Sequence, residues 1–202
     1  LAGQIPPMVN ANESMDNDEV VQVAVDNVAA AKTAVNYLIG EGHKRIAAIT
    51  GPSDIPSSNE RLQGYFDALQ EANIDIDSDL QMAGDYTVDS GINCAEQLLL
   101  LRKRPTAIFC FNDEMAIGVM KLLKKQGFLI PEDISVMGFD DIHYAEYVTP
   151  ALTTVHQPLH EIGTTCINLL LEQLRGNYVV PGKQFLPFEL KVRASTGPAP
   201  IV

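Results

Sequence analysis

The chain has 202 residues, enough for one large domain or two small ones, and its 46% hydrophobic content can fill a core. No stretch approaches the roughly 18 consecutive apolar residues of a membrane-spanning helix, so we expect a soluble globular protein with no membrane partner. Its 14 Lys and Arg residues against 26 Asp and Glu residues give a net charge of −12, which opposes binding to a phosphate backbone. The chain by itself is therefore not expected to bind DNA.

From residue 20 to residue 139 the sequence alternates short apolar segments with longer helical ones. The predicted strands are residues 20–25, 46–49, 81–83, 107–111 and 134–139. The predicted helices are residues 27–41, 57–72, 88–101 and 112–126, and Gly42 and Gly127 are expected to end two of them. Strands that are apolar on both faces and separated by helices predict an α/β fold with a parallel sheet covered on both sides. Ligands bind such sheets at the carboxyl ends of the strands.

After residue 141 the pattern changes. A short extended piece at residues 149–155 precedes a helix at about 158–175 and a further extended piece at 184–191. We interpret this part as the chain crossing to a second lobe, to which the N-terminal segment also belongs. The cysteines Cys94, Cys110 and Cys166 are widely spaced inside apolar patterns, which is typical of reduced, buried thiols in a cytoplasmic protein.

Two patterns imitate metal sites without completing one. The series Asp75-x-Asp77-x-Asp79 begins like a calcium loop, but the glycine and the glutamate that such a loop needs later are missing. His156 and His160 are four residues apart, with a proline between them and no evident third ligand. No phosphate-binding loop, dinucleotide fingerprint or nucleophile elbow occurs. We therefore name no catalytic residue, metal ligand or cofactor, and the chain is not expected to be an enzyme.

Polar side chains gather at the predicted strand ends. Asp140 and Asp141 follow one strand, Asn112 follows another, and Tyr86 comes shortly after a third. Arg61 lies in the first part of a helix that follows a fourth strand. Spacing alone leaves two interpretations open. These residues contact a ligand at the carboxyl edge, or they are a helix cap (Asn112), a turn residue (Asp140) and a half-buried aromatic (Tyr86).

A series of short motifs occurs in one order along nearly the whole chain. They are Val25-Asp26-Asn27, Gly42-His43-Lys44-Arg45-Ile46, Gly51-Pro52, Arg61-Leu62-x-Gly64-Tyr65, Pro105-Thr106-Ala107-Ile108-Phe109, Asn112-Asp113-x-Met115-Ala116-x-Gly118, Pro131-Glu132-Asp133-Ile134-Ser135-Val136-x-Gly138-Phe139-Asp140-Asp141, and Pro150-x-Leu152-Thr153-Thr154 to Gln157-Pro158. Each motif is weak alone. Together and in this order they closely resemble the effector-binding core of LacI/GalR transcription regulators.

The resemblance implies two Rossmann-like lobes of the periplasmic-binding-protein type, joined by three crossovers, with an effector held between them. The N-terminal lobe is then incomplete in this chain and the DNA-binding headpiece is absent. The implied divisions are residues 1–26 (N-terminal lobe), 27–156 (C-terminal lobe), 157–190 (return to the N-terminal lobe) and 191–202 (last crossover and tail). The family also implies a cytoplasmic homodimer that contacts operator DNA only through the missing headpiece.

The same resemblance implies a set of ligand-binding residues. Arg61 is the expected charged donor, and Asp140 the expected acceptor for hydroxyl groups of the effector. Asn12 stands where many members of the family have an aspartate, and Ser57 lies in the loop before Arg61. The full predicted set is Asn12, Ser57, Arg61, Tyr86, Asn112 and Asp140.

Within the family, two segments resemble the cytidine-repressor (CytR-like) branch. They are Pro7-Met8-Val9-x-Ala11-Asn12-Glu13 and Arg61-Leu62-Gln63-Gly64-Tyr65. This branch implies a pyrimidine nucleoside such as cytidine, with Tyr86 stacking on the base and Asp140 bonding the ribose hydroxyls. Ile55 stands where the purine repressor has an arginine that reads the base, which disfavours a purine effector.

Three alternatives stay open. The first is a sugar-sensing member of the same family. The second is a periplasmic sugar-binding protein, which shares the fold and would carry a signal peptide. The third is an enzyme of doubly wound fold, which would need a nucleophile or a general base beside the crevice.

Overall fold

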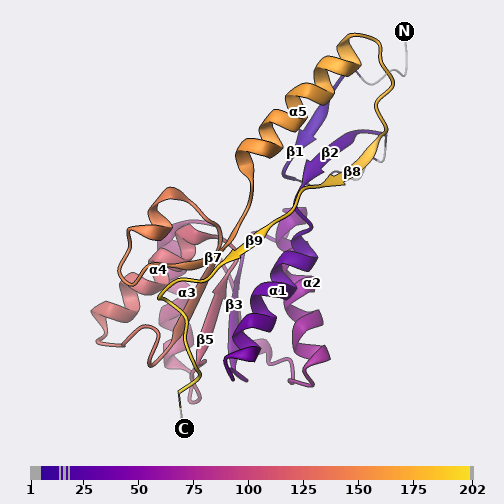
Figure 1. Ribbon diagram of the computed structural model, residues 1–202. Coiled ribbons are helices and arrows are strands. Elements are labelled where there is room, and N and C mark those ends of the chain that lie inside the picture. The colour runs from indigo at the N-terminus through magenta and orange to yellow at the C-terminus, as the bar shows by residue number, and fades with distance from the viewer. Residues whose placement is uncertain (1–5, 14, 16, 18, 201–202) are drawn as a thin grey trace. The chain divides into compact units, whose positions relative to one another are not determined.

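The computed structural model describes residues 6–13, 15, 17 and 19–200, and these form two compact units (Figure 1). One unit combines the described residues up to Asp26 with Gln157–Phe188. The other combines Asn27–His156 with the described residues from Glu189 onward. The assignment of these units to the two lobes of a regulator stays a prediction, as do the segment divisions given above.

The larger unit contains a six-stranded sheet with the strand order β4-β3-β5-β6-β7-β9. Its strands are β3 (Ile46–Thr50), β4 (Gln81–Ala83), β5 (Ala107–Cys110), β6 (Ser135–Asp140), β7 (Thr153–His156) and β9 (Glu189–Lys191). All neighbouring pairs are parallel except β7 and β9, which are antiparallel. The predicted parallel α/β sheet is therefore confirmed.

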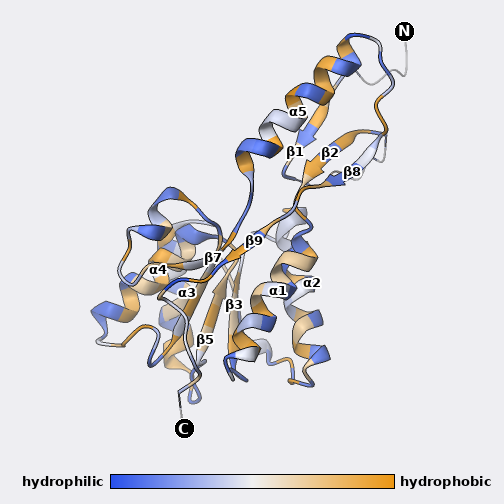
Figure 2. Cartoon of the chain, viewed as in Figure 1, coloured by the Kyte–Doolittle hydropathy of each residue, from blue (hydrophilic) through white to orange (hydrophobic). Residues whose placement is uncertain are grey.

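Four helices cover this sheet. They are α1 (Asn27–Gly40), α2 (Pro56–Glu71), α3 (Val88–Leu100) and α4 (Asp113–Lys125). Helix α1 packs against α2 and α3 packs against α4, with the sheet between the two pairs (Figure 1). Short 3₁₀ turns, η1 (Ser78–Leu80) and η2 (His143–Glu146), lie in the connections. Figure 2 shows the central strands as predominantly hydrophobic, as expected for strands buried on both faces.

Local sequence signals account for the ends of these helices. The side chain of Asn112 accepts a hydrogen bond from the Met115 N–H and so caps α4. Acidic residues in the first turn of α4 and lysines in its last turn complement the helix dipole. Gly42 and Gly127 have φ angles of 93° and 82°, which confirms that they end α1 and α4 as left-handed residues.

Glycine also allows the paired helices to approach closely. A β-carbon placed on Gly64 in α2 would lie 2.2 Å from the carbonyl oxygen of Val28 in α1. A β-carbon on Gly118 in α4 would lie 2.1 Å from the carbonyl oxygen of Val88 in α3. No real side chain tolerates such distances, so both helix pairs depend on glycine at these positions.

The smaller unit has a three-stranded parallel sheet in the order β1-β2-β8, and one helix packs on it. The elements are β1 (Val9–Ala11), β2 (Val21–Ala24), β8 (Gly182–Phe185) and α5 (Leu159–Leu174). The extended piece predicted at 184–191 is wrong as a single element, because β8 pairs with β2 while β9 pairs with β7 in the other unit. Among the described residues, no helix is long and apolar enough to cross a membrane.

Candidate ligand-binding site

The guanidinium of Arg61 is the best-anchored of the predicted site residues. Arg61 lies in the second turn of α2 and is only 5% exposed. Its Nε donates to Oδ1 of Asn27 at 2.9 Å, and its Nη1 donates to the carbonyl oxygen of Phe111. The guanidinium carbon lies 3.7 Å from the ring centroid of Phe139, in a cation–π contact. The guanidinium also forms an ion pair with Asp140, whose Oδ1 is 3.7 Å from Nη1.

Asp140 ends β6 in an unusual backbone conformation. Its φ angle is 114°, and Asp141 follows with a φ of 58°, so two consecutive non-glycine residues occupy the left-handed side of the Ramachandran map. Such conformations cost free energy and cluster at functional sites. The carboxylate of Asp141 bonds within the chain, 2.9 Å from Nδ1 of His156 and 2.7 Å from Nη2 of Arg193. The Asp140 side chain is 25% exposed beside Arg61, so solvent reaches this carboxylate.

Asn112 uses both ends of its amide inside the chain. Its Oδ1 accepts from the Met115 N–H at 3.0 Å, and its Nδ2 donates to the carbonyl oxygen of Tyr86 at 2.9 Å. The helix-cap interpretation of Asn112 is therefore confirmed. The bond to Tyr86 joins the start of α4 to the loop that follows β4, in which Tyr86 has a φ of 71°. Whether Asn112 also contacts a ligand stays a prediction.

The ring of Tyr86 packs on a glycine. A β-carbon on Gly51 would lie 2.1 Å from Cζ of this ring, so the absence of a side chain there makes room for it. The Tyr86 hydroxyl is buried and has no hydrogen-bond partner among the described residues. An unpaired buried hydroxyl costs about 1–3 kcal/mol, and a polar group from outside the chain would remove that cost.

The two other predicted residues, Ser57 and Asn12, are separated between the units. The placement of Ser57 in the loop before Arg61 is wrong, because Ser57 lies in the first turn of α2, one turn before Arg61, and is buried. Asn12 belongs to the smaller unit, where it has a φ of 64° and its N–H donates to the carbonyl oxygen of Val23 at 2.8 Å. The Oδ1 atom of Asn12 is buried and lacks a partner among the described residues. Ligand contact by Ser57 and Asn12 stays a prediction.

Sequence reasoning missed the residues that support Arg61 and Asp140. Asn27 and Phe139 hold the guanidinium, and Asp113 lies beneath the turn that contains Asp140. All three stand inside the family-like motifs. The signal was therefore present, but only the packing of separate elements reveals that these side chains converge.

Asp113 is a fully buried carboxyl at the start of α4. Its Oδ1 accepts from the hydroxyl of Thr154 at 2.5 Å, and its Oδ2 accepts from the Ile142 N–H at 2.8 Å. Burial, and to a smaller extent the nearby carboxyls of Asp140 and Asp141, raise the pKa of Asp113 to about 7 against the lowering effect of the two hydrogen bonds.

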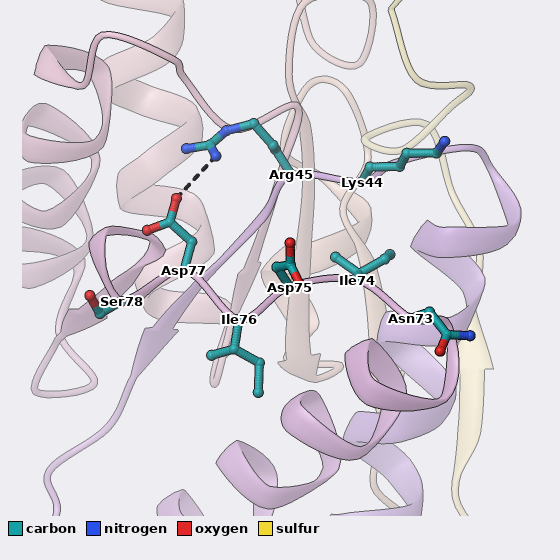
Figure 3. Close-up of a pocket in the computed structure, with 8 residues that line it drawn as sticks. All are labelled: Lys44, Arg45, Asn73, Ile74, Asp75, Ile76, Asp77 and Ser78. Atoms are coloured by element: carbon teal, nitrogen blue, oxygen red, sulfur yellow. Dashed lines mark hydrogen bonds and ion pairs between the residues drawn. The ribbon is translucent and has the colours of Figure 1, made fainter.

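A separate hollow of about 640 Å³ lies at the opposite, amino end of β3 (Figure 3). Lys44 and Arg45 line it together with residues 73–78, which include two members of the aspartate series weighed as a calcium loop. Asp77 uses its carboxylate to bond Arg45 at 3.0 Å and the Asp79 N–H at 3.0 Å. The Asp79 N–H and then Arg45 hold the pKa of Asp77 below its usual range. This hollow contains none of the predicted ligand-binding residues.

Comparison with known proteins places this geometry in a family. Residues 35–196 match the periplasmic binding protein-like domain family. Over 196 residues the chain is 44% identical to the HTH-type transcriptional repressor CytR of Escherichia coli K12. That match covers 97% of this chain and 58% of the repressor, so the chain spans little more than half the length of this relative.

Solved structures agree in fold. A LacI-family regulatory protein from Chloroflexus aggregans superposes with a TM-score of 0.87 at 38% identity, over 94% of this chain and 68% of that protein. A complex of the transcriptional regulator CelR with cellobiose superposes with a TM-score of 0.86 at 35% identity, over 93% of this chain and 57% of that protein. The family and the fold predicted from the ordered motifs are thereby confirmed. The chain belongs to the LacI family of transcription regulators and has the periplasmic-binding-protein-like fold of their effector domain.

Proposed function

We propose that this domain senses a pyrimidine nucleoside, with cytidine as the first candidate, at the carboxyl edge of its six-stranded sheet. Binding would modulate how the full-length repressor, a homodimer in the cytoplasm, holds its operator. The observation that carries the proposal is the buried Arg61 guanidinium beside the partly exposed Asp140 carboxylate, 3.7 Å apart at that edge.

The chemistry of this pair suits a ligand with vicinal hydroxyl groups. A carboxylate accepts two hydroxyl hydrogens, and a guanidinium donates to hydroxyl oxygens in a fixed direction. Arg61 is held by Asn27, Phe111 and Phe139, so little side-chain entropy is lost when it binds. A hydrogen bond to a charged group contributes about 1.5–3 kcal/mol, enough to decide which ligand binds.

The base end of a nucleoside would meet Tyr86. Its buried hydroxyl lacks a partner among the described residues, and a polar group on a bound ligand would supply one. The CytR-like segments around Asn12 and Arg61 and the 44% identity to CytR support a nucleoside over other effectors.

The direct test is titration calorimetry with cytidine on the wild-type chain and on Asp140→Asn. Losing one charged acceptor should weaken cytidine binding roughly 10- to 150-fold, while the melting temperature stays within a few degrees. Asp75→Asn is the matched control, because it makes the same charge change at an exposed position that lines the opposite hollow. Unchanged cytidine binding in Asp140→Asn would reduce Asp140 to a turn residue.

Tyr86 is tested with two variants. Aromatic stacking contributes about 1–3 kcal/mol per base in single-strand binders, so Tyr86→Ala should weaken cytidine roughly 5- to 150-fold. Tyr86→Phe keeps the ring over Gly51 and removes only the hydroxyl, and so separates stacking from hydrogen bonding. Free ribose has no base to stack, so it should bind poorly and respond little to either variant.

A sugar effector is the second candidate, and the similarity to the CelR–cellobiose complex favours it. A sugar also offers vicinal hydroxyls to Arg61 and Asp140. Tight binding of a pentose, a hexose or cellobiose, with no response to cytidine or uridine, would assign the domain to that branch.

A further inference from the structure

The buried Asp113 connects the start of α4 to β7 and to the turn that follows β6. It is the first residue of α4, directly after Asn112, and it bonds Thr154 in β7 and the backbone of Ile142, two residues after Asp140. We propose that Asp113 is a positioning residue, a brace that sets the Asp140–Asp141 turn in its ligand-binding geometry. The ligand-binding part of this inference rests on the function proposed above.

The turn needs such a brace because its backbone is unfavourable. Asp140 and Asp141 both have positive φ angles, which L-residues hold only where the surroundings impose them. The bond from the Ile142 N–H to Oδ2 of Asp113, at 2.8 Å, closes the turn from below. On its other side, Arg193 and His156 hold the Asp141 carboxylate. The Asp140 carboxylate is thereby left to face Arg61.

The surroundings of the Asp113 side chain fit a carboxyl group closely. Its Oδ1 lies so close to β6 that a β-carbon on Gly138 would be 2.1 Å away. Thr154, in the neighbouring strand, donates to the same oxygen. The side chain is fully buried, so no water replaces these partners if the carboxyl is removed.

The charged groups around Asp113 affect its ionisation, and this allows its contact with the Ile142 N–H to be followed by titration. The carboxyls of Asp140 and Asp141 face it from the end of β6, and both disfavour a negative charge on Asp113. Arg61 beside Asp140 and Arg193 beside Asp141 offset part of that repulsion. Because the pKa of Asp113 is raised to about 7, its charge changes within an accessible pH range, and the Ile142 N–H bonded to it reports the change.

The test is NMR on the ligand-free domain from pH 5 to 9. In the wild type, the Ile142 amide proton should titrate with the charge of Asp113 and be protected from exchange. In Asp113→Asn the titration should disappear. In Asp113→Ala, which leaves the Ile142 N–H without its acceptor, Ile142 should exchange at least 10-fold faster. The Val119 amide, inside α4, should stay unchanged as the control for global unfolding. Equal protection of Ile142 in the wild type and in Asp113→Ala would overturn the brace.

Thr154→Val provides a second test of the same contact in case Asp113→Ala does not fold. It removes the hydroxyl that lowers the pKa of Asp113 and leaves the bond to Ile142 in place. The Ile142 titration should therefore move to higher pH, and a midpoint that does not move would contradict the contact.

Cytidine titrations then separate the two proposals. Asp113→Ala should weaken cytidine binding about 10-fold in the wild-type background and cause little further loss in Asp140→Asn, because it acts through Asp140. If Ile142 loses protection and cytidine affinity is retained, the positioning role is overturned. If the wild type does not bind cytidine, the proposed effector fails. The brace is then decided on the ligand-free protein, by the protection of the Ile142 amide in Asp113→Ala.

Discussion

The buried carboxyl of Asp113 gives the stability of this domain a specific pH dependence. Its pKa is about 7 in the folded protein against a model value of 3.8, a shift of about three pH units. At about 1.36 kcal/mol per unit, the charged form costs the folded state roughly 4 kcal/mol. That is a large fraction of the 5–15 kcal/mol by which domains are usually stable.

The sign follows from proton binding. Between about pH 4 and pH 7 the folded protein keeps a proton on Asp113 that the unfolded chain has lost. The folded state then binds more protons, so the contribution of Asp113 to the free energy of unfolding falls as the pH rises, and it levels off above about pH 7. Asp113→Asn removes this titration.

The assay is urea unfolding of the wild type and Asp113→Asn at half-unit steps from pH 5 to 8. The free energy of unfolding of the wild type minus that of the variant should fall by about 2 kcal/mol between pH 5 and pH 6.5, and then level off above about pH 7. Asp75→Asn controls for the loss of one negative charge at an exposed position. A difference that is constant with pH, or that grows as the pH rises, would refute the reasoning. Thr154, Ile142 and the helix dipole would then stabilise the carboxylate more than burial penalises it.

Three further predictions concern packing, the anchoring of Arg61 and DNA. Gly64→Ala should destabilise the domain by about 1–3 kcal/mol, because the new methyl group would overlap the carbonyl of Val28. The melting temperature should fall by roughly 2–12 °C. An unchanged melting curve would contradict the close contact of α1 and α2. Asn27→Ala removes the acceptor of the Arg61 Nε–H, so urea unfolding should show a free energy of unfolding lower by about 1–3 kcal/mol. Calorimetry should show a lower affinity for cytidine. A gel shift at low salt with an operator bound by the full-length repressor should show no complex with this chain, whose net charge is −12; a specific, salt-sensitive complex would contradict that expectation.

Local patterns in the sequence were enough to predict much of the fold. The apolar runs that became β3, β5 and β6 are buried on both faces, and this pattern predicts a parallel sheet whatever the order of its strands. Gly127 and the cap at Asn112 depend on neighbours within one helical turn, so the ends of α4 could also be read directly. The order of the short motifs along the chain was enough to predict the family.

The tertiary structure decided which of these residues meet. β8 and β9 look like one extended segment in the sequence, yet they lie in different sheets, because pairing partners far along the chain determine where a strand belongs. In the same way Asp113, read locally, is an ordinary acidic residue in the first turn of a helix. It becomes a buried carboxyl with a raised pKa only because α4 packs against β6 at Gly138, with Thr154 in the next strand. Desolvation and charge repulsion depend on what surrounds a group in space, and spacing along the chain carries no record of that.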